Sequence, residues 1–126
     1  MQTLITKPIR KILIENHKRG IEIRSTLDDD GNEQDIDFAP VLKLFCPWNK
    51  TTWLITELDP ETNIAFGLGD LGIGFPELGY ISIDELKSIK HPSGVTIERD
   101  RHFNAYGRFL NGFARDARDA LSLIHI

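Results

Sequence analysis

The residues of this sequence that could do chemistry are concentrated in the middle of the chain, where carboxylates greatly outnumber basic side chains. Residues 28–85 hold thirteen Asp and Glu against only Lys43 and Lys50, a balance of −11 in a chain whose net charge is −4. Carboxylates gathered in this way can bind a metal ion, form an acid–base pair or attract a basic partner. A nucleic-acid-binding protein is expected to show a basic face, so we expect no direct nucleic-acid binding. The simplest alternative is that these acids solvate the outer face of a sheet.

A glycine-rich segment in this centre has the spacing of a phosphate-binding loop. Residues 67–72 match G-x-G-x-x-G, a pattern that binds dinucleotides only where the loop enters a helix whose amides meet the phosphates. Gly74 and Pro76 oppose a helix, and Asp70 places a negative charge where a phosphate would lie. We therefore expect no nucleotide or other cofactor, and a loop shaped by its glycines.

Four oxygen-bearing side chains fall on the template of a calcium loop. Asp59, Glu61, Asn63 and Asp70 stand at its positions 1, 3, 5 and 12. Position 6 requires a glycine for a sharp turn and is Ile64 here. A solvated acidic turn is the better prediction, and no metal is expected.

The histidines and the single cysteine do not follow a metal or nucleophile motif. No H-E-x-x-H pattern or cysteine pair is present. Cys46 lies at the end of a predicted strand and is expected to be a buried thiol. The histidines, each predicted to lie at a surface or turn, are His17, His91, His102 and His125.

An enzyme remains an alternative to a binding protein. A small metal-dependent hydrolase would need its carboxylates and a histidine to meet in one pocket with perturbed pKa values. The residues available for this are Asp59, Asp70, Glu77, Glu98 and His102. The polar run 98–102 is explained more simply by outward-facing charges that pair across a sheet.

The elements that must position these residues follow from apolar periodicity and from capping residues. A helix capped by Thr6 is expected to end at Gly20. Ser82 and Glu85 form a capping box for a short helix that runs to residue 89, and an amphipathic helix starts near residue 108. Strands are predicted at residues 21–24, 41–46, 51–58, 64–68, 79–82 and 95–99. This order predicts an α+β fold: an antiparallel β-meander with the N-terminal, middle and C-terminal helices packed on one side.

Length and composition favour a single domain over residues 1–126. The chain contains no apolar run long enough to span a membrane and no secretion signal, and its lone cysteine excludes an internal disulfide framework. We therefore expect a soluble cytoplasmic protein. The segment 28–37 has six acids and no base, which predicts an exposed acidic loop.

Four sequence blocks resemble a family of small bacterial proteins known as domain of unknown function 2958. The blocks are DFAPVLKLFCP, TWLITELDPE, IAFGLGDLGIGFPELGYISIDEL and IERDRHF, and they span residues 37–103. The resemblance implies an accessory protein of conjugative plasmids and related mobile elements, and it supplies no catalytic residues. The acidic segment 28–37 and the last residues are expected to lie outside this match. The last residues, 121–126, resemble an adapter-derived tail that is not native.

These features favour a non-enzymatic interaction protein, an inhibitor of a host defence nuclease such as a CRISPR effector. Nucleic-acid enzymes expose channels of Lys and Arg for phosphates, and an acidic surface is complementary to such a channel. Phe75, between Gly74 and Pro76, is expected to be an exposed contact residue. The predicted contact residues are Asp28, Asp29, Asp30, Glu33, Asp35, Asp37, Glu57, Asp59, Glu61, Asp70, Phe75 and Glu77.

Overall fold

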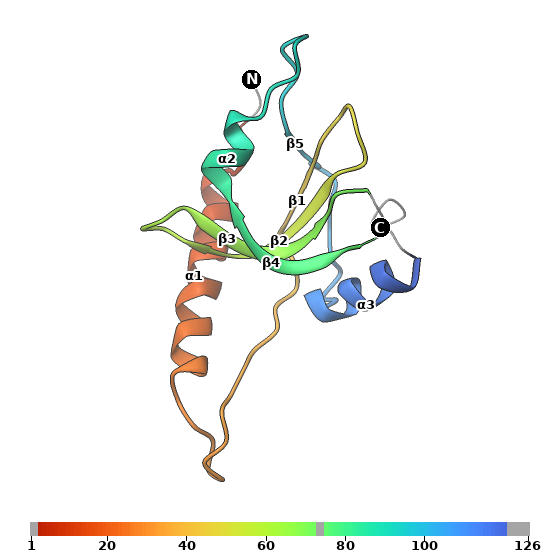
Figure 1. Cartoon of the computed structure of the whole chain (residues 1–126). Coiled ribbons are helices and arrows are strands. Elements are labelled where there is room, and N and C mark those ends of the chain that lie inside the picture. The colour runs from red at the N-terminus through yellow and green to blue at the C-terminus, as the bar shows by residue number, and fades with distance from the viewer. Residues whose placement is uncertain (1–2, 73–74, 121–126) are drawn as a thin grey trace.

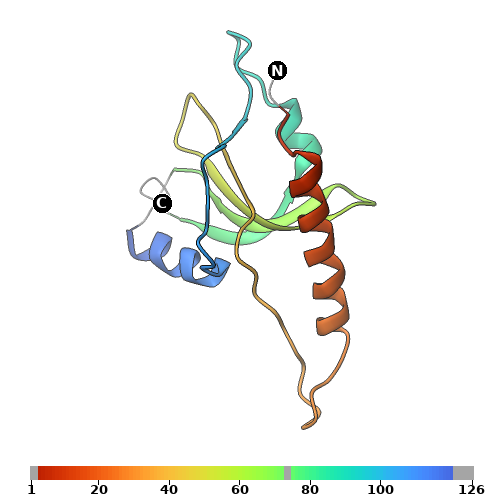
Figure 2. The same ribbon diagram turned by 180° about the vertical axis from the view of Figure 1, so that it is seen from behind.

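A computed structural model describes residues 3–72 and 75–120 as an α+β fold, which confirms the predicted class (Figures 1 and 2). The predicted non-native tail, residues 121–126, lies outside the described residues. In chain order the elements are α1 (Lys7–Arg24), β1 (Leu42–Phe45), β2 (Thr52–Asp59), β3 (Ile64–Asp70), β4 (Glu77–Ser82), α2 (Ile83–Ser88), β5 (Glu98–Arg99) and α3 (Leu110–Ala120). None of the helices in these two ranges has the length and hydropathy that crossing a lipid bilayer requires.

The five strands form one antiparallel sheet in the order β4-β3-β2-β1-β5. β1 to β4 follow one another as the predicted meander, while β5 adds to the outer edge of β1. The register of β2 and β3 shifts between Ile55 and Glu57, where β2 carries a bulge. The bulge matters for the site, because one extra residue reverses the faces on which the following side chains lie.

The helices cover both faces of the sheet, so the prediction that they pack on one side is wrong. Ile55 belongs to the core under α1 and α2, which includes Leu13 and Leu86. Leu54, its neighbour in β2, belongs to a second core with Phe113. Neighbouring residues of a strand point to opposite faces, so α3 lies on the face opposite α1. Figures 1 and 2 show α1 and α3 on different sides of the sheet.

The first helix runs four residues further than the sequence predicted. Thr6 caps it as expected, because its Oγ1 accepts a hydrogen bond from the Ile9 amide at 3.4 Å. Gly20 does not end the helix, and residues 21–24 continue it instead of forming a strand. Gly20 is buried, and a Cβ there would lie 2.5 Å from Glu57 Oε1. The glycine therefore leaves room for the paired Glu57 and Arg24 side chains beside the helix, at a cost in helix propensity of about 1 kcal/mol.

The C-terminal part is less regular than the sequence predicted. The strand expected over 95–99 is reduced to β5, preceded by a single bridge between Lys90 and Thr96. The last helix begins at Leu110, so Phe109 precedes it and is exposed. The apolar stripe of α3 nevertheless packs on the sheet through Leu110, Phe113 and Ala117.

Candidate functional site

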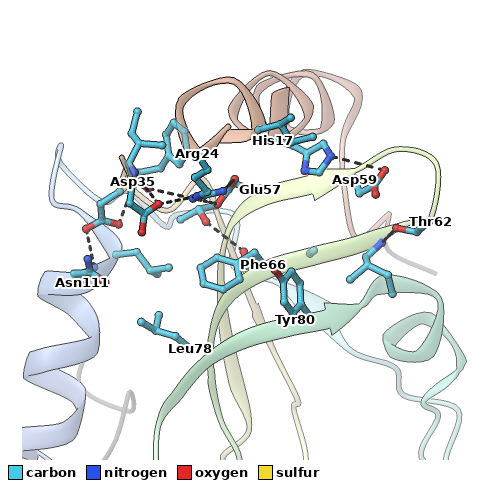
Figure 3. A pocket seen from close by; sticks show the side chains of 18 residues that line it. His17, Arg24, Asp35, Glu57, Asp59, Thr62, Phe66, Leu78, Tyr80 and Asn111 are labelled. Carbon is cyan, nitrogen blue, oxygen red and sulfur yellow. Dashed lines mark hydrogen bonds and ion pairs between the residues drawn. The ribbon is translucent and has the colours of Figure 1, made fainter. Parts of the chain in front are cut away.

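A groove of about 860 Å³ lies on the face of the sheet that α3 covers only in part (Figure 3). Its walls come from the C-terminal half of α1, the start of α3 and residues 35–38, which we call the strap. Its floor is the exposed part of β2, β3 and β4. Ligand sites in proteins commonly measure about 300–1,000 Å³, so this groove has a suitable size for a small ligand or a few inserted side chains.

The floor of the groove is aromatic and aliphatic. Phe66 and Tyr80 lie opposite each other on β3 and β4, with ring centroids 5.5 Å apart and planes at 67°. Leu78 extends this surface, and Tyr80 is 83% exposed. Exposed aromatic faces in a concave site favour apolar groups and cations.

Arg24, at the end of α1, joins three parts of the chain on one wall of the groove. Its Nη1 lies 3.0 Å from Glu57 Oε1 on β2, and its Nε lies 2.6 Å from Asp35 Oδ1 on the strap. Its Nη2 also donates to the Ile36 carbonyl at 3.2 Å. Hydrogen bonding to Glu57 is the largest cause that raises the pKa of Arg24. Hydrogen bonds from Arg24 and then from the Ile36 amide lower the pKa of Asp35.

The bulge in β2 explains why Glu57 faces this groove. Ile55 and Leu58 both pack in the core under α1, although residues three apart in a regular strand point to opposite faces. The extra residue at the bulge keeps both in that core and turns Glu57 toward the groove, opposite Phe66. Glu57 is only 4% exposed, so its charge depends on Arg24 for compensation.

Asp37 fixes the other end of the strap to α3. Its Oδ2 accepts a hydrogen bond from the Asn111 amide at 3.0 Å, in the first turn of that helix. The Leu110 amide donates to the Phe38 carbonyl at 2.8 Å. Amides of a first helical turn have no partner within the helix, and a carboxylate there is favourable for the helix dipole. The strap is therefore held by α1 on one side and by α3 on the other.

His17 and Asp59 meet at the end of the groove near the β2–β3 turn. The His17 Nε2 lies 3.9 Å from Asp59 Oδ1. Asp59 Oδ1 also accepts the Glu61 amide at 2.9 Å, and this hydrogen bond is the largest cause that lowers the pKa of Asp59. The groove thus contains four carboxylates, one guanidinium and one imidazole.

The predicted contact residues do not form one patch. Residues 28–33 lie at the tip of a segment that extends past the end of α1, away from the sheet (Figures 1 and 2). Asp35, Asp37, Glu57 and Asp59 line the groove. Glu61 lies in the β2–β3 turn, while Asp70 and Glu77 lie at the opposite end of β3, and Phe75 precedes β4.

Half of the predicted contact residues are exposed and form no side-chain hydrogen bond or ion pair with another described residue. Phe75 is 71% exposed. Within the described ranges, no side-chain hydrogen bond or ion pair is recorded for the exposed acids Asp29, Asp30, Glu33, Glu61 and Glu77. Asp28 differs, because its Oδ1 accepts the amides of Asp30 and Asn32 and closes the turn of the acidic loop. A contact role for these residues stays a prediction.

Two of the predicted contact residues are buried, so their side chains offer little surface to a partner. Glu57 is the ion-pair partner of Arg24, and Asp70 is 0% exposed. Asp70 Oδ1 accepts the Gly72 amide at 2.8 Å, so it helps to shape the turn after β3. A partner could not touch Asp70 without opening the fold.

The glycines of the motif at residues 67–72 have a structural role in the sheet and at the end of β3. A Cβ at Gly67 would overlap the Leu54 carbonyl oxygen of β2, so only glycine permits this strand spacing. Gly72 adopts a φ of 81°, which favours glycine. Residues 67–70 belong to β3 and do not enter a helix, in agreement with the expected structural role.

The geometry does not assemble the calcium template or the proposed catalytic set. Asp59 pairs with Ile64 at one end of the β2–β3 ladder, and Asp70 pairs with Thr52 at the other end. Glu98 lies on β5 at the far edge of the sheet. Among the described residues, no three His, Cys, Asp or Glu side chains are grouped in a way that could hold a metal ion.

The sequence reasoning missed the groove and its central residue, Arg24. It assigned residues 21–24 to a strand, which hid the position of Arg24 one helical turn after Gly20. A glycine inside an amphipathic helix with an arginine four residues later is the signal that could have indicated a buried acid nearby. Phe66 and Tyr80 were missed as a pair because their register depends on the β3–β4 pairing.

Comparison with known proteins gives one family. The chain matches the family described as "Protein of unknown function (DUF2958)" over residues 4–124. This match includes the acidic segment 28–37 and residues 121–124, so the prediction that the acidic segment and the last residues lie outside it is wrong for both. Neither the curated proteins nor the solved structures contain a significant match. Because the match covers nearly the whole chain, this protein belongs to the DUF2958 family.

Proposed function

We propose that this protein is a non-enzymatic interaction module that binds basic side chains of a partner protein in the groove. The observation that carries this proposal is the pairing of an acidic wall with an exposed aromatic floor in one concave site. Lys and Arg side chains combine an aliphatic stem with a cationic head, so they fit a site of this kind.

The charges of the groove support a cationic partner. Asp35, Asp37, Glu57 and Asp59 face one guanidinium, that of Arg24, which leaves a formal charge of −3 with His17 neutral. The Asp35 side chain is 80% exposed and that of Asp59 is 31% exposed, so both can be approached from solvent. Complementary charge steers a basic partner and disfavours acidic ones.

The partner class that we propose is a nucleic-acid enzyme of a bacterial host, with this protein acting as its inhibitor. Such enzymes line their channels with Lys and Arg to hold phosphates. An acidic module from a mobile genetic element would compete with nucleic acid for those side chains. A defence nuclease of the CRISPR type is the specific candidate.

An acid–base enzyme is the alternative, and one observation favours it. His17 and Asp59 lie 3.9 Å apart at the end of the groove. A carboxylate beside a histidine can orient it for proton transfer. Replacing His17 by Gln separates the two functions, because it would abolish catalysis and leave charge-driven binding nearly unchanged.

Two charge-matched double variants test the binding proposal. Asp35→Asn with Asp59→Asn removes two charges from the groove and keeps an oxygen in place of each hydrogen-bond acceptor. Asp29→Asn with Asp30→Asn removes the same charge from the tip of the acidic loop. Each is assayed for inhibition of DNA cleavage by purified CRISPR effector nucleases, after thermal melting has verified the fold.

We expect wild-type protein to inhibit one of these nucleases, the groove variant to bind it about tenfold more weakly, and the loop variant to bind within about twofold of wild type. Equal losses in both variants would contradict a role for the groove. Absence of inhibition by wild-type protein would contradict the nuclease assignment.

A further inference from the structure

We infer that β4 is a docking edge at which an extended segment of the partner protein adds a sixth strand to the sheet. β4 stands at the end of the strand order, and no strand of the described ranges pairs with its outer side. The opposite edge is β5, which has only two residues. β4 has six residues and pairs with β3 without a register shift, so it is the longer and more regular edge.

The backbone of β4 presents hydrogen-bonding groups outward at alternate residues. The Ile83 amide donates to the Asn63 carbonyl on the β3 side at 3.2 Å. In an antiparallel ladder the N–H and C=O of one residue point the same way, and those of the next residue point the opposite way. Leu78 and Tyr80 are odd steps away from Ile83, so their backbone groups point away from β3.

A hydrogen bond to Phe66 independently confirms which residues of β4 have outward-pointing backbone groups. Its carbonyl accepts a hydrogen bond from Thr56 Oγ1 on β2 at 3.3 Å. Phe66 is the ladder partner of Tyr80, and its carbonyl points away from β4. Phe66 and Tyr80 are therefore a pair that is not joined by backbone hydrogen bonds, as the assignment requires.

This edge lacks the features that usually prevent strand addition. Natural edge strands carry Lys or Pro, contain a bulge or are covered by another element. β4 contains neither Lys nor Pro, and no bulge is recorded in its pairing. Tyr80 in β4 is 83% exposed, and two apolar residues that precede the strand, Phe75 and Leu71, are 71% and 64% exposed. A regular edge strand with one charged residue, Glu77, and with no Lys, Pro or bulge can accept a further strand.

Charge indicates that the occupant is a different protein and not a second copy of this chain. Residues 71–86 contain Glu77, Asp84 and Glu85 and no Lys or Arg. Pairing of two copies through β4 would bring two such acidic edges together, and like charges on paired strands are unfavourable. A segment with basic residues on both sides of an apolar centre complements this edge.

The inference rests on the proposed function for the basic character of the partner, but it adds a main-chain contact that the groove does not require. Leu78 and Tyr80 point their side chains into the groove, so an added strand would extend the groove floor. Strand addition provides affinity through main-chain hydrogen bonds and specificity through alternate side chains.

The test uses a synthetic peptide with two Lys or Arg residues at each end and a Val-Thr-Val-Thr-Val centre. Two further peptides carry N-methyl groups on one or the other alternate set of central amides. Strand addition predicts that one methylated peptide binds like the parent and that the other binds at least about tenfold more weakly, because only one edge of the peptide faces β4. Equal binding of both methylated peptides would overturn the inference.

Hydrogen exchange and a protein variant locate the contact. In the complex, exchange of the Leu78 and Tyr80 amides should slow at least about tenfold. Tyr80→Pro removes an outward N–H, while Tyr80→Val keeps it and serves as the control for loss of the ring. Proline is tolerated on the solvent side of an edge strand, and thermal melting checks that the variant folds.

We expect Tyr80→Pro to abolish peptide binding and Tyr80→Val to retain it within about threefold. Unchanged exchange at Leu78 and Tyr80, or a wild-type dimer that Tyr80→Pro dissociates, would overturn the inference. Binding that is lost in the Asp35→Asn, Asp59→Asn variant but kept in Tyr80→Pro would overturn strand addition and leave the proposed function standing.

Discussion

Removal of the Arg24 guanidinium should destabilise the protein more than an ordinary surface substitution does. Arg24→Met keeps the aliphatic stem and a good helix former, so it isolates the loss of charge and hydrogen bonds. The Glu57 side chain, which is 6% exposed, would then keep a carboxylate without its cation, and the strap would lose its contact through Asp35.

The size of the expected loss of stability follows from the exposed fractions of the Glu57 and Arg24 side chains. Removing one partner of a fully buried ion pair costs about 3–5 kcal/mol. The Arg24 side chain is 40% exposed, so solvent screens part of this interaction and the expected loss is about 2 kcal/mol. For a chain of this length that corresponds to a decrease in Tm of about 8 °C.

A double variant shows whether the isolated charge causes the loss. Glu57→Gln added to Arg24→Met replaces the carboxylate by a neutral amide, and we expect it to restore about 1 kcal/mol of the free energy of unfolding. Urea unfolding followed by circular dichroism at neutral pH measures all three proteins. A loss below about 0.5 kcal/mol for Arg24→Met, or a double variant less stable than the single one, would contradict the role of Arg24 in compensating the Glu57 charge.

Three further predictions concern the elements around the groove. Gly20→Ala should lower the free energy of unfolding by about 1 kcal/mol or more, although alanine has the better helix propensity, because the new Cβ would meet the Glu57 carboxylate. The control Gly112→Ala in α3 should be neutral or stabilising in the same urea assay. Asp37→Ala should cost about 1 kcal/mol and speed hydrogen exchange in the first turn of α3, and unchanged exchange at Asn111 would contradict the cap. The pKa of Asp35 is lowered in the folded protein, so its carboxylate contributes fully to stability at neutral pH and loses this contribution as pH falls below about 4. The urea midpoint should therefore fall less on acidification in Asp35→Asn than in wild type. An equal fall in both proteins would contradict this role of Asp35.

Much of the fold could be predicted because local signals and tertiary packing agree. Thr6 and Ser82 cap helices as expected, and the alternating apolar segments form the meander. Gly20 misled the prediction because its reason is tertiary: the Glu57 and Arg24 side chains occupy the space where its side chain would lie. Propensity alone describes a glycine as a stop, whereas close packing can require one inside a helix.

The candidate site was less predictable than the fold, because its residues come together through pairings far apart in sequence. The acidic centre gave the sign of the charge, but it did not separate Asp29 and Asp30 at the loop tip from Asp59 in the groove. Burial of Glu57 depends on the β2 bulge, which has no clear pattern in the sequence. Composition therefore indicated the sign of the charge, and the topology determined which carboxylates share the groove.

We propose that the partner binds in the groove and not at the acidic loop. A titration followed by nuclear magnetic resonance tests this most directly. A ¹⁵N-labelled protein is titrated with a short Lys- and Arg-rich peptide at moderate salt, and amide shifts are mapped on the structure. Binding in the groove should give the largest shifts at Asp35, Asp59, Phe66 and Tyr80, with residues 28–33 nearly unchanged. Shifts concentrated at residues 28–33, with the groove unaffected, would contradict it.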